Sequence, residues 1–161
     1  MIRNIILLFI FTILCIGCHE NDRLTYTTKP SVFFPDYVTG KDSVTYSFRM
    51  TKEDRDTIYL TAKLVGKSFE TRTPIGLKID KEQTTAQEGI YYEMEDSYWF
   101  EPGKGEIEIP IYLIQGGTDI DDDILSIALQ LIPTEDIDVA YEDKSRVYVR
   151  ITNKLVKPSY W

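Results

Sequence analysis

Four carboxylates crowd a short stretch in the second half of the chain: Asp119, Asp121, Asp122 and Asp123. Clustered carboxylate oxygens suit Ca²⁺, because the ion takes several hard oxygen ligands and relieves their mutual repulsion. An EF-hand is excluded: counting from Asp119, the sixth position is Ile124 rather than glycine and the twelfth is Gln130 rather than glutamate. The favoured interpretation is a solvated acidic loop between two strands. A calcium site at Asp119, Asp121 and Asp123 is the alternative.

Glu106 and Glu108 form a second carboxylate pair, on a stretch in which they alternate with isoleucines. Paired carboxylates hydrolyse glycosides when they lie about 5 or about 9 Å apart in a site that tunes their pKa values. Neighbours two apart on an exposed strand lack such a pocket, so a solvated face is favoured. The chain has one histidine, His19, and we find no phosphate loop, nucleophile elbow or histidine pair. We therefore expect no catalytic residues and no enzyme activity.

Aromatic residues are the feature most suited to binding, and the candidates are Tyr91, Tyr98 and Trp99. Flat rings stack on the apolar faces of sugars and of other amphipathic partners. Alternation along a strand puts Tyr98 and Phe100 on one side and Trp99 on the other, and one of those sides must face the core. Burial statistics favour a core role for most of these rings. Which side is core is left open.

The elements that must position these residues are β-strands. Ile107, Ile109, Ile111 and Leu113 alternate with other residues, and Leu125, Ile127, Leu129 and Leu131 repeat the pattern. Turn residues bound each predicted strand, and no window has a helical period. The predicted strands are 31–34, 42–50, 57–65, 73–80, 98–101, 105–114, 124–131 and 146–152. About seven to eight strands predict an all-β, immunoglobulin-like Greek-key sandwich.

The first 17 residues are predicted to be a lipoprotein signal peptide. Arg3 precedes an apolar run, 5–16, that is shorter than the roughly 20 residues of a membrane-spanning helix. The run ends in Leu14-Cys15-Ile16-Gly17-Cys18, which resembles a bacterial lipobox with Cys18 as the acylated residue. A plain secretory signal and an uncleaved anchor are the alternatives. Because both cysteines lie in this segment, the domain that follows is expected to lack disulfides and thiolate metal sites.

The charge of the chain excludes some partners. The formal net charge is −8, from 18 basic and 26 acidic side chains. Removing the leader takes away Arg3 and leaves 17 basic and 26 acidic side chains, a net charge of −9. An excess of negative charge repels nucleic acids and anionic headgroups. We expect no nucleic-acid partner, and membrane attachment through lipid at Cys18 rather than through a basic patch.

The chain resembles two families. The residues 84–86, Gly89, Tyr92 and the turn Phe100-Glu101-Pro102-Gly103 are similar to the Calx-beta repeat. Tyr91 stands where calcium-binding members have an aspartate, and Gln115-Gly116-Gly117 replaces their aspartate pair, so most of that calcium site is missing.

The second resemblance is to an uncharacterised Bacteroidetes lipoprotein family. It rests on 44–48, 64–66, the TTAQEG segment and the C-terminal KPSYW, together with the lipobox. That family is associated with outer-membrane glycan-uptake systems, and its members commonly continue past the tryptophan, whereas this chain ends at Trp161.

Together these features predict a signal peptide (1–17), a tether (18–29), a β-sandwich domain (30–152) and a C-terminal tail (153–161), natural or truncated. The resemblance implies a lipid-anchored, non-catalytic outer-membrane protein, exposed at the cell surface or facing the periplasm. It would bind glycans or serve glycan-uptake proteins, without a cofactor. The alternative is a structural or adhesive protein–protein module, stiffened by calcium at the aspartate loop.

Overall fold

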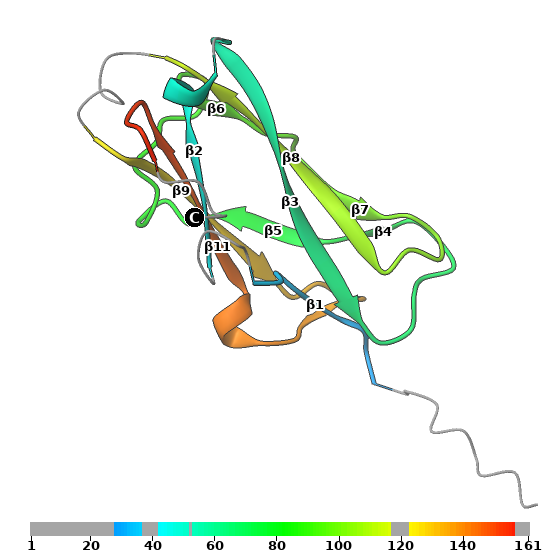
Figure 1. Ribbon diagram of the computed structural model, residues 1–161. Coiled ribbons are helices and arrows are strands. Elements are labelled where there is room, and N and C mark those ends of the chain that lie inside the picture. The colour runs from blue at the N-terminus through cyan, green and yellow to red at the C-terminus, as the bar shows by residue number, and fades with distance from the viewer. Residues whose placement is uncertain (1–27, 37–41, 52, 117–122, 157–161) are drawn as a thin grey trace, which may run out of the picture.

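The computed structural model describes residues 28–36, 42–51, 53–116 and 123–156, which fold into a β-sandwich (Figure 1). The bounds of its strands are β1 Ser31–Phe33, β2 Ser43–Ser47, β3 Arg55–Val65, β4 Thr73–Pro74, β5 Gly76–Ile79, β6 Tyr92–Glu93, β7 Trp99–Phe100, β8 Glu106–Ile114, β9 Leu125–Ile132, β10 Asp138–Val139 and β11 Arg146–Thr152. Two short 3₁₀ turns, η1 (Phe48–Met50) and η2 (Glu142–Lys144), interrupt them. Within these ranges no helix has the length and apolarity needed to span a bilayer.

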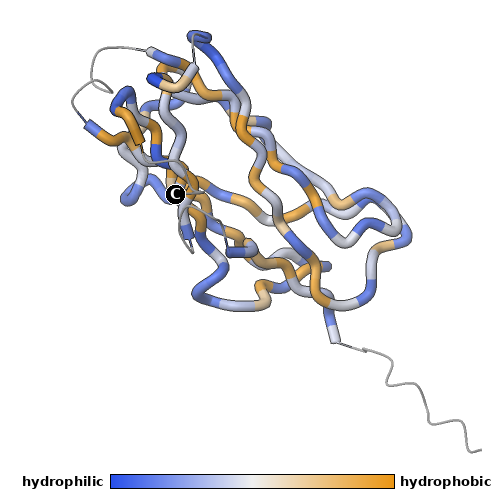
Figure 2. The backbone as a smooth tube through the Cα atoms, in the orientation of Figure 1, coloured by the Kyte–Doolittle hydropathy of each residue, from blue (hydrophilic) through white to orange (hydrophobic). Residues whose placement is uncertain are grey.

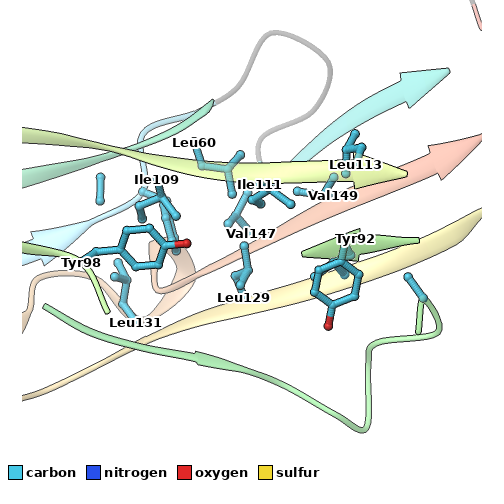
Figure 3. Packing of buried hydrophobic residues seen from close by; sticks show 14 of the residues in the cluster. Leu60, Tyr92, Tyr98, Ile109, Ile111, Leu113, Leu129, Leu131, Val147 and Val149 are labelled. Carbon is cyan, nitrogen blue, oxygen red and sulfur yellow. The ribbon is translucent and has the colours of Figure 1, made fainter. Parts of the chain in front are cut away.

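Two sheets face each other across the core. One has the strand order β10-β1-β3-β8-β6 and the other the order β2-β11-β9-β5, and β4 with β7 forms a small separate ladder. Apolar side chains of both sheets meet between them, as Figure 3 shows for Leu60, Ile109 and Ile111 against Leu129 and Val147. The all-β sandwich predicted from strand alternation is confirmed.

The longest ladder pairs β3 with β8 in antiparallel register, from Arg55 opposite Ile114 to Lys63 opposite Glu106. Along both strands apolar and polar residues alternate, which is visible as the change of colour along the tube in Figure 2. Because successive side chains point to opposite faces of a strand, every second residue enters the core and the others face solvent. This ladder carries the candidate site described below.

Two predicted strands are divided in the structure. The strand predicted over 73–80 first pairs with β7 as β4 and then with β9 as β5, so the chain changes sheets at Ile75, whose N–H donates to the Tyr98 carbonyl (3.0 Å). Gly76 permits the change, because a Cβ there would lie 2.2 Å from the carbonyl oxygen of Ile132. The strand predicted over 42–50 ends at Ser47, whose hydroxyl accepts the Arg49 N–H (3.2 Å) and so caps η1.

Candidate functional site

The outward face of the five-stranded sheet carries two exposed tyrosines, Tyr59 on β3 and Tyr112 on β8. Leu60 and Ile111 are fully buried, so the alternation of each strand turns the neighbouring tyrosine to solvent. The exposed fractions of Tyr59 and Tyr112 are 60% and 37%. An aromatic ring exposed on a flat sheet offers a surface on which a ligand can stack.

Register brings the two tyrosines together. Tyr59 lies opposite Pro110 and Tyr112 lies opposite Thr57, so the tyrosines are diagonal neighbours. Diagonal neighbours in an antiparallel ladder are about 7–8 Å apart, within reach of aromatic side chains. We call the surface formed by Thr57, Tyr59, Pro110 and Tyr112 the tyrosine face.

The hydrogen-bond pattern of the ladder brings the side chains of this face close together. The Leu64 N–H donates to the Gly105 carbonyl (2.8 Å), which makes the inward-facing pairs the hydrogen-bonded ones. The outward pairs are then the non-hydrogen-bonded ones, whose side chains lie closer. Pro110 belongs to such a pair, so its missing N–H removes no bond to β3.

A buried tyrosine fixes the position of a carboxylate beside this face. The hydroxyl of Tyr98 donates to the Pro110 carbonyl (3.2 Å) and accepts the backbone N–H of Glu95 (3.0 Å). The Glu95 carboxylate in turn accepts the hydroxyl of Tyr112 (3.2 Å). The hydroxyl of Tyr98 therefore holds the backbone of Glu95 beside Pro110 of β8. The Glu95 carboxylate in turn orients Tyr112.

The electrostatics of Tyr112 follow from this contact. Partial loss of solvent is the largest cause that raises the pKa of the Tyr112 phenol. The hydrogen bond to Glu95 and the negative charge of that carboxylate raise the pKa further, as does Tyr59 when it ionises. Because the neutral phenol is favoured, Tyr112 remains a hydrogen-bond donor near neutral pH.

An open hollow of about 520 Å³ adjoins Tyr112 at one end of the face. Its lining includes Arg55 and Glu93, whose charged groups lie 3.7 Å apart. The rest of the lining comes from Asp56, Thr57, Tyr112 and Leu113. Polar groups that adjoin an aromatic surface are the usual arrangement of a site that fixes the orientation of a ligand.

A second hollow, of about 390 Å³, lies between β5 and residues 94–98. Its floor is aliphatic, with Leu77, Ile79 and Met94, and its aromatic member is Tyr98, which is only 5% exposed. It offers no exposed ring on which a planar ligand can stack.

The predicted aromatic binding residues are placed differently from one another. Tyr91 and Tyr98 are each 5% exposed and belong to the core, so neither presents a ring face to solvent. Trp99 is half-buried on β7, and the guanidinium of Arg72 lies 4.3 Å from the centre of its ring. Arg72 also pairs with Glu101 (3.1 Å). Arg72 thus covers one face of Trp99 and leaves at most the other for a ligand.

Several predicted positions fall outside the described residues, namely Cys18, Asp119 and Asp121. Asp123 is described and is exposed, next to the start of β9. Within the described ranges, no group of three or more acidic, histidine or cysteine side chains is arranged to hold a metal ion. The calcium alternative therefore stays a prediction that rests on the sequence.

The carboxylate pair Glu106 and Glu108 lies on the outward side of β8, exposed as the sequence predicts. Glu106 pairs with Lys63 across the ladder (3.5 Å).

Sequence analysis missed Tyr59 and Tyr112, although the signal was present. Each sits between aliphatic residues whose alternation assigns them to the core, so each must face outward.

The sequence matches one family over most of its length. Residues 24–161 match a domain of unknown function, DUF4843. No curated protein matches the chain.

The fold is similar to several solved structures. The apo form of the CBD1 domain of Calx superposes with a TM-score of 0.53 at 16% identity, covering 78% of this chain and 97% of that domain. A two-domain protein of unknown function from Bacteroides fragilis gives a TM-score of 0.55 at 12% identity, covering 77% of this chain and 45% of that one. A Bacteroides ovatus protein assigned provisionally to carbohydrate binding gives a TM-score of 0.53 at 10% identity, covering 78% of this chain and 37% of that one.

The chain thus spans less than half the length of either Bacteroides protein. At these identities the likeness establishes the fold alone, a Calx-beta-like sandwich.

Proposed function

The chain belongs to the DUF4843 family, whose function is unknown, and from this starting point we propose that it is a non-catalytic glycan-binding protein of the cell envelope. It is anchored by lipid at Cys18 to the outer membrane, exposed at the cell surface, and serves as an accessory component of a polysaccharide-uptake system. The tyrosine face is its binding site.

The observation that carries this proposal is the exposed tyrosine pair with Glu95 beside it. A sugar ring has apolar C–H faces that stack on aromatic rings and equatorial hydroxyls that need hydrogen-bond acceptors. Tyr59 and Tyr112 supply the first, and the carboxylate that orients Tyr112 supplies the second. The hollow beside Tyr112 is open to solvent, which suits a polymer that must pass across a surface rather than enter a closed pocket.

The position of the predicted anchor supports an accessible face. Ser31 pairs with Val65, so the chain enters the sandwich at the end of β3 that is opposite Arg55 (Figure 1). Arg55 and Val65 are the ends of an 11-residue strand, which at about 3.3 Å per residue is roughly 35 Å long. A lipid at Cys18, ten residues before Thr28, would attach the sandwich through the Val65 end of β3 rather than through the Arg55 end.

The likeness to the Bacteroides ovatus protein adds weaker support. That protein is assigned provisionally to carbohydrate binding, and it shares this fold at 10% identity. Fold similarity alone does not transfer a ligand, so the proposal rests on the tyrosine face rather than on this neighbour.

Affinity electrophoresis of the full chain in detergent, across gels that each contain one polysaccharide, tests the proposal. At least one polysaccharide is expected to retard the chain. Tyr59→Ala and Tyr112→Ala should each weaken that binding by roughly threefold to tenfold, the value of one aromatic stacking contact.

Tyr148→Ala is the matched control, because Tyr148 lies on the outward side of β11, in the opposite sheet, between buried Val147 and Val149. Binding that survives Tyr59→Ala and Tyr112→Ala but is lost with Trp99→Ala would move the site to the free face of Trp99. A chain retarded by no polysaccharide would contradict the proposal and favour the structural or adhesive alternative.

A further inference from the structure

The ionisable side chains around the tyrosine face are mostly acidic. The outward residues of β3, β6 and β8, together with Glu95, include two cations and four carboxylates, a formal charge of −2. These are Arg55, Lys63, Glu93, Glu95, Glu106 and Glu108.

Both cations are already paired with carboxylates. Arg55 pairs with Glu93 (3.7 Å) and Lys63 with Glu106 (3.5 Å). No other lysine or arginine projects from the outward positions of these three strands as described. An anionic ligand would therefore have to break an existing pair to find a cation on this face.

The two remaining carboxylates stand at the two ends of the tyrosine pair. Glu108 and Tyr112 are the outward residues of β8 on either side of Pro110, which lies opposite Tyr59. The carboxylate of Glu95 lies beside Tyr112 and accepts a hydrogen bond from its hydroxyl. Neither Glu95 nor Glu108 makes an ion pair with a cation in the described ranges, so both keep lone pairs for a ligand.

Carboxylates in this position select the chemistry of the ligand. Ionised carboxylates only accept hydrogen bonds, and the hydroxyls of an uncharged sugar donate them. A uronate or a sulfate ester placed on the same rings would meet the like charges of Glu95 and Glu108, and both cations at the outward positions of these strands are already paired.

The spacing of the tyrosines sets a minimum ligand length. Diagonal residues of an antiparallel ladder are about 7–8 Å apart, so the rings of Tyr59 and Tyr112 present two separate stacking surfaces rather than one shared surface. A single sugar ring covers one tyrosine, whereas neighbouring rings of one chain can cover both.

We infer that the tyrosine face binds an uncharged oligosaccharide of at least two sugar units and rejects glycans that carry carboxylate or sulfate groups. This inference rests on the proposed function and specifies its ligand class.

The test compares polysaccharides that share a backbone and differ in charge. The full chain in detergent is run through gels containing β-glucan, mannan or xylan, each beside its carboxymethylated form, and beside polygalacturonate and chondroitin sulfate. An unmodified polysaccharide should retard the chain, and its carboxymethylated form should bind about tenfold more weakly or not at all. Raising the salt concentration should leave binding of the neutral form unchanged and narrow the difference between the two.

Glu95→Gln tests the source of the selectivity. This variant keeps the size of the side chain and removes one charge, so the carboxymethylated form should gain affinity relative to the neutral one. Glu135→Gln is the charge-matched control, since Glu135 is exposed in the loop between β9 and β10, and should leave the ratio unchanged. Circular dichroism and urea unfolding of each variant check that the fold is intact.

The length requirement is measured by competition. A disaccharide or trisaccharide from the bound polysaccharide should release the chain at concentrations about tenfold lower than the monosaccharide, because it contacts both tyrosines. Equal potency of the monosaccharide would overturn the two-unit requirement.

The two levels of the proposal fail differently. Binding of an anionic glycan as tight as that of its neutral counterpart, lost in Tyr112→Ala and kept in Tyr148→Ala, would overturn the selectivity and leave glycan binding standing. Retardation by none of the polysaccharides would remove glycan binding itself.

Discussion

Tyr98 belongs to the core of this protein, and its hydroxyl group makes hydrogen bonds to the candidate site. It contacts Pro110 and the backbone of Glu95, and its ring lies between the sheets beside Leu131 and Ile109 (Figure 3). A residue predicted as a ligand contact from its aromatic type thus has a different place in the structure. It positions the carboxylate that orients Tyr112.

Tyr98→Phe is therefore expected to act on a site it does not touch. The ring stays packed while the Pro110 carbonyl and the Glu95 N–H each lose a partner, so the free energy of unfolding should fall by about 1–2 kcal/mol. The pKa of Tyr112 should also fall toward that of a free phenol, because Glu95 is no longer held. Urea unfolding and ultraviolet titration of tyrosine measure the two effects.

Tyr92→Phe is the control for that change. Its ring is 2% exposed, and within the described ranges its hydroxyl makes no hydrogen bond. It should leave the titration of Tyr112 unaltered, and a Tyr112 shift of equal size in both variants would argue against positioning by Tyr98.

Alkaline pH should destabilise the protein through its tyrosines. Burial raises the pKa of Tyr92 and Tyr98, and burial followed by the hydrogen bond and charge of Asp56 raises the pKa of Tyr46, whose hydroxyl lies 2.6 Å from that carboxylate. A raised native pKa means that the folded state holds its proton more tightly than the unfolded chain. The stabilisation is fully present below the unfolded value of about 10 and is lost as pH rises through the native values.

The urea midpoint should accordingly fall between pH 9 and pH 11, the range around the ordinary phenol pKa of about 10. The tyrosines of the folded protein should titrate at higher pH than the tyrosines of the same chain unfolded in concentrated urea. Asp56→Asn should bring the titration of Tyr46 down. Coincident native and unfolded titration curves would refute this account.

At the scale of elements, β8 serves the core and the site with its two faces. Its inward residues Ile109, Ile111 and Leu113 are fully buried, while Glu108 and Tyr112 face outward. Substitutions of the inward residues of β8 should therefore change stability, whereas substitutions of its outward residues should change binding.

Ile111→Ala should lower the free energy of unfolding by about 2–5 kcal/mol, since it leaves a cavity between two sheets that are already packed. Glu108→Ala, one face away, should change it by no more than about 0.5 kcal/mol. Urea unfolding of the two variants measures the contrast. Similar losses in both would contradict the assignment of the two faces.

At the scale of the whole molecule, the proposed lipid anchor at Cys18 would hold the sandwich at a membrane. Cys18→Ala should move the chain from the membrane fraction to the soluble fraction and abolish labelling by a radioactive fatty acid, because two or three acyl chains give lasting attachment. Cys15→Ala should keep both properties. Persistence of Cys18→Ala in the membrane fraction would favour the uncleaved anchor instead.

The expected strands are found because each depends on local alternation. The runs around Ile109 and Ile127 specify strands by themselves, and two such runs need a second layer to cover them. The short strand β10 is not among the predicted strands, since a two-residue segment carries no period and forms only because neighbouring strands offer partners. The division of 73–80 between two ladders likewise depends on contact with β7 and β9.

The sequence by itself determined that this is an all-β sandwich and that Tyr59 and Tyr112 must face away from the aliphatic residues beside them, because alternation is a property of a single strand. Only the tertiary structure decided that those tyrosines are neighbours and that Tyr98 and Tyr91 are buried. Cross-strand register and the covering of one face by another sheet join residues far apart in the chain, and no local pattern encodes which residues meet.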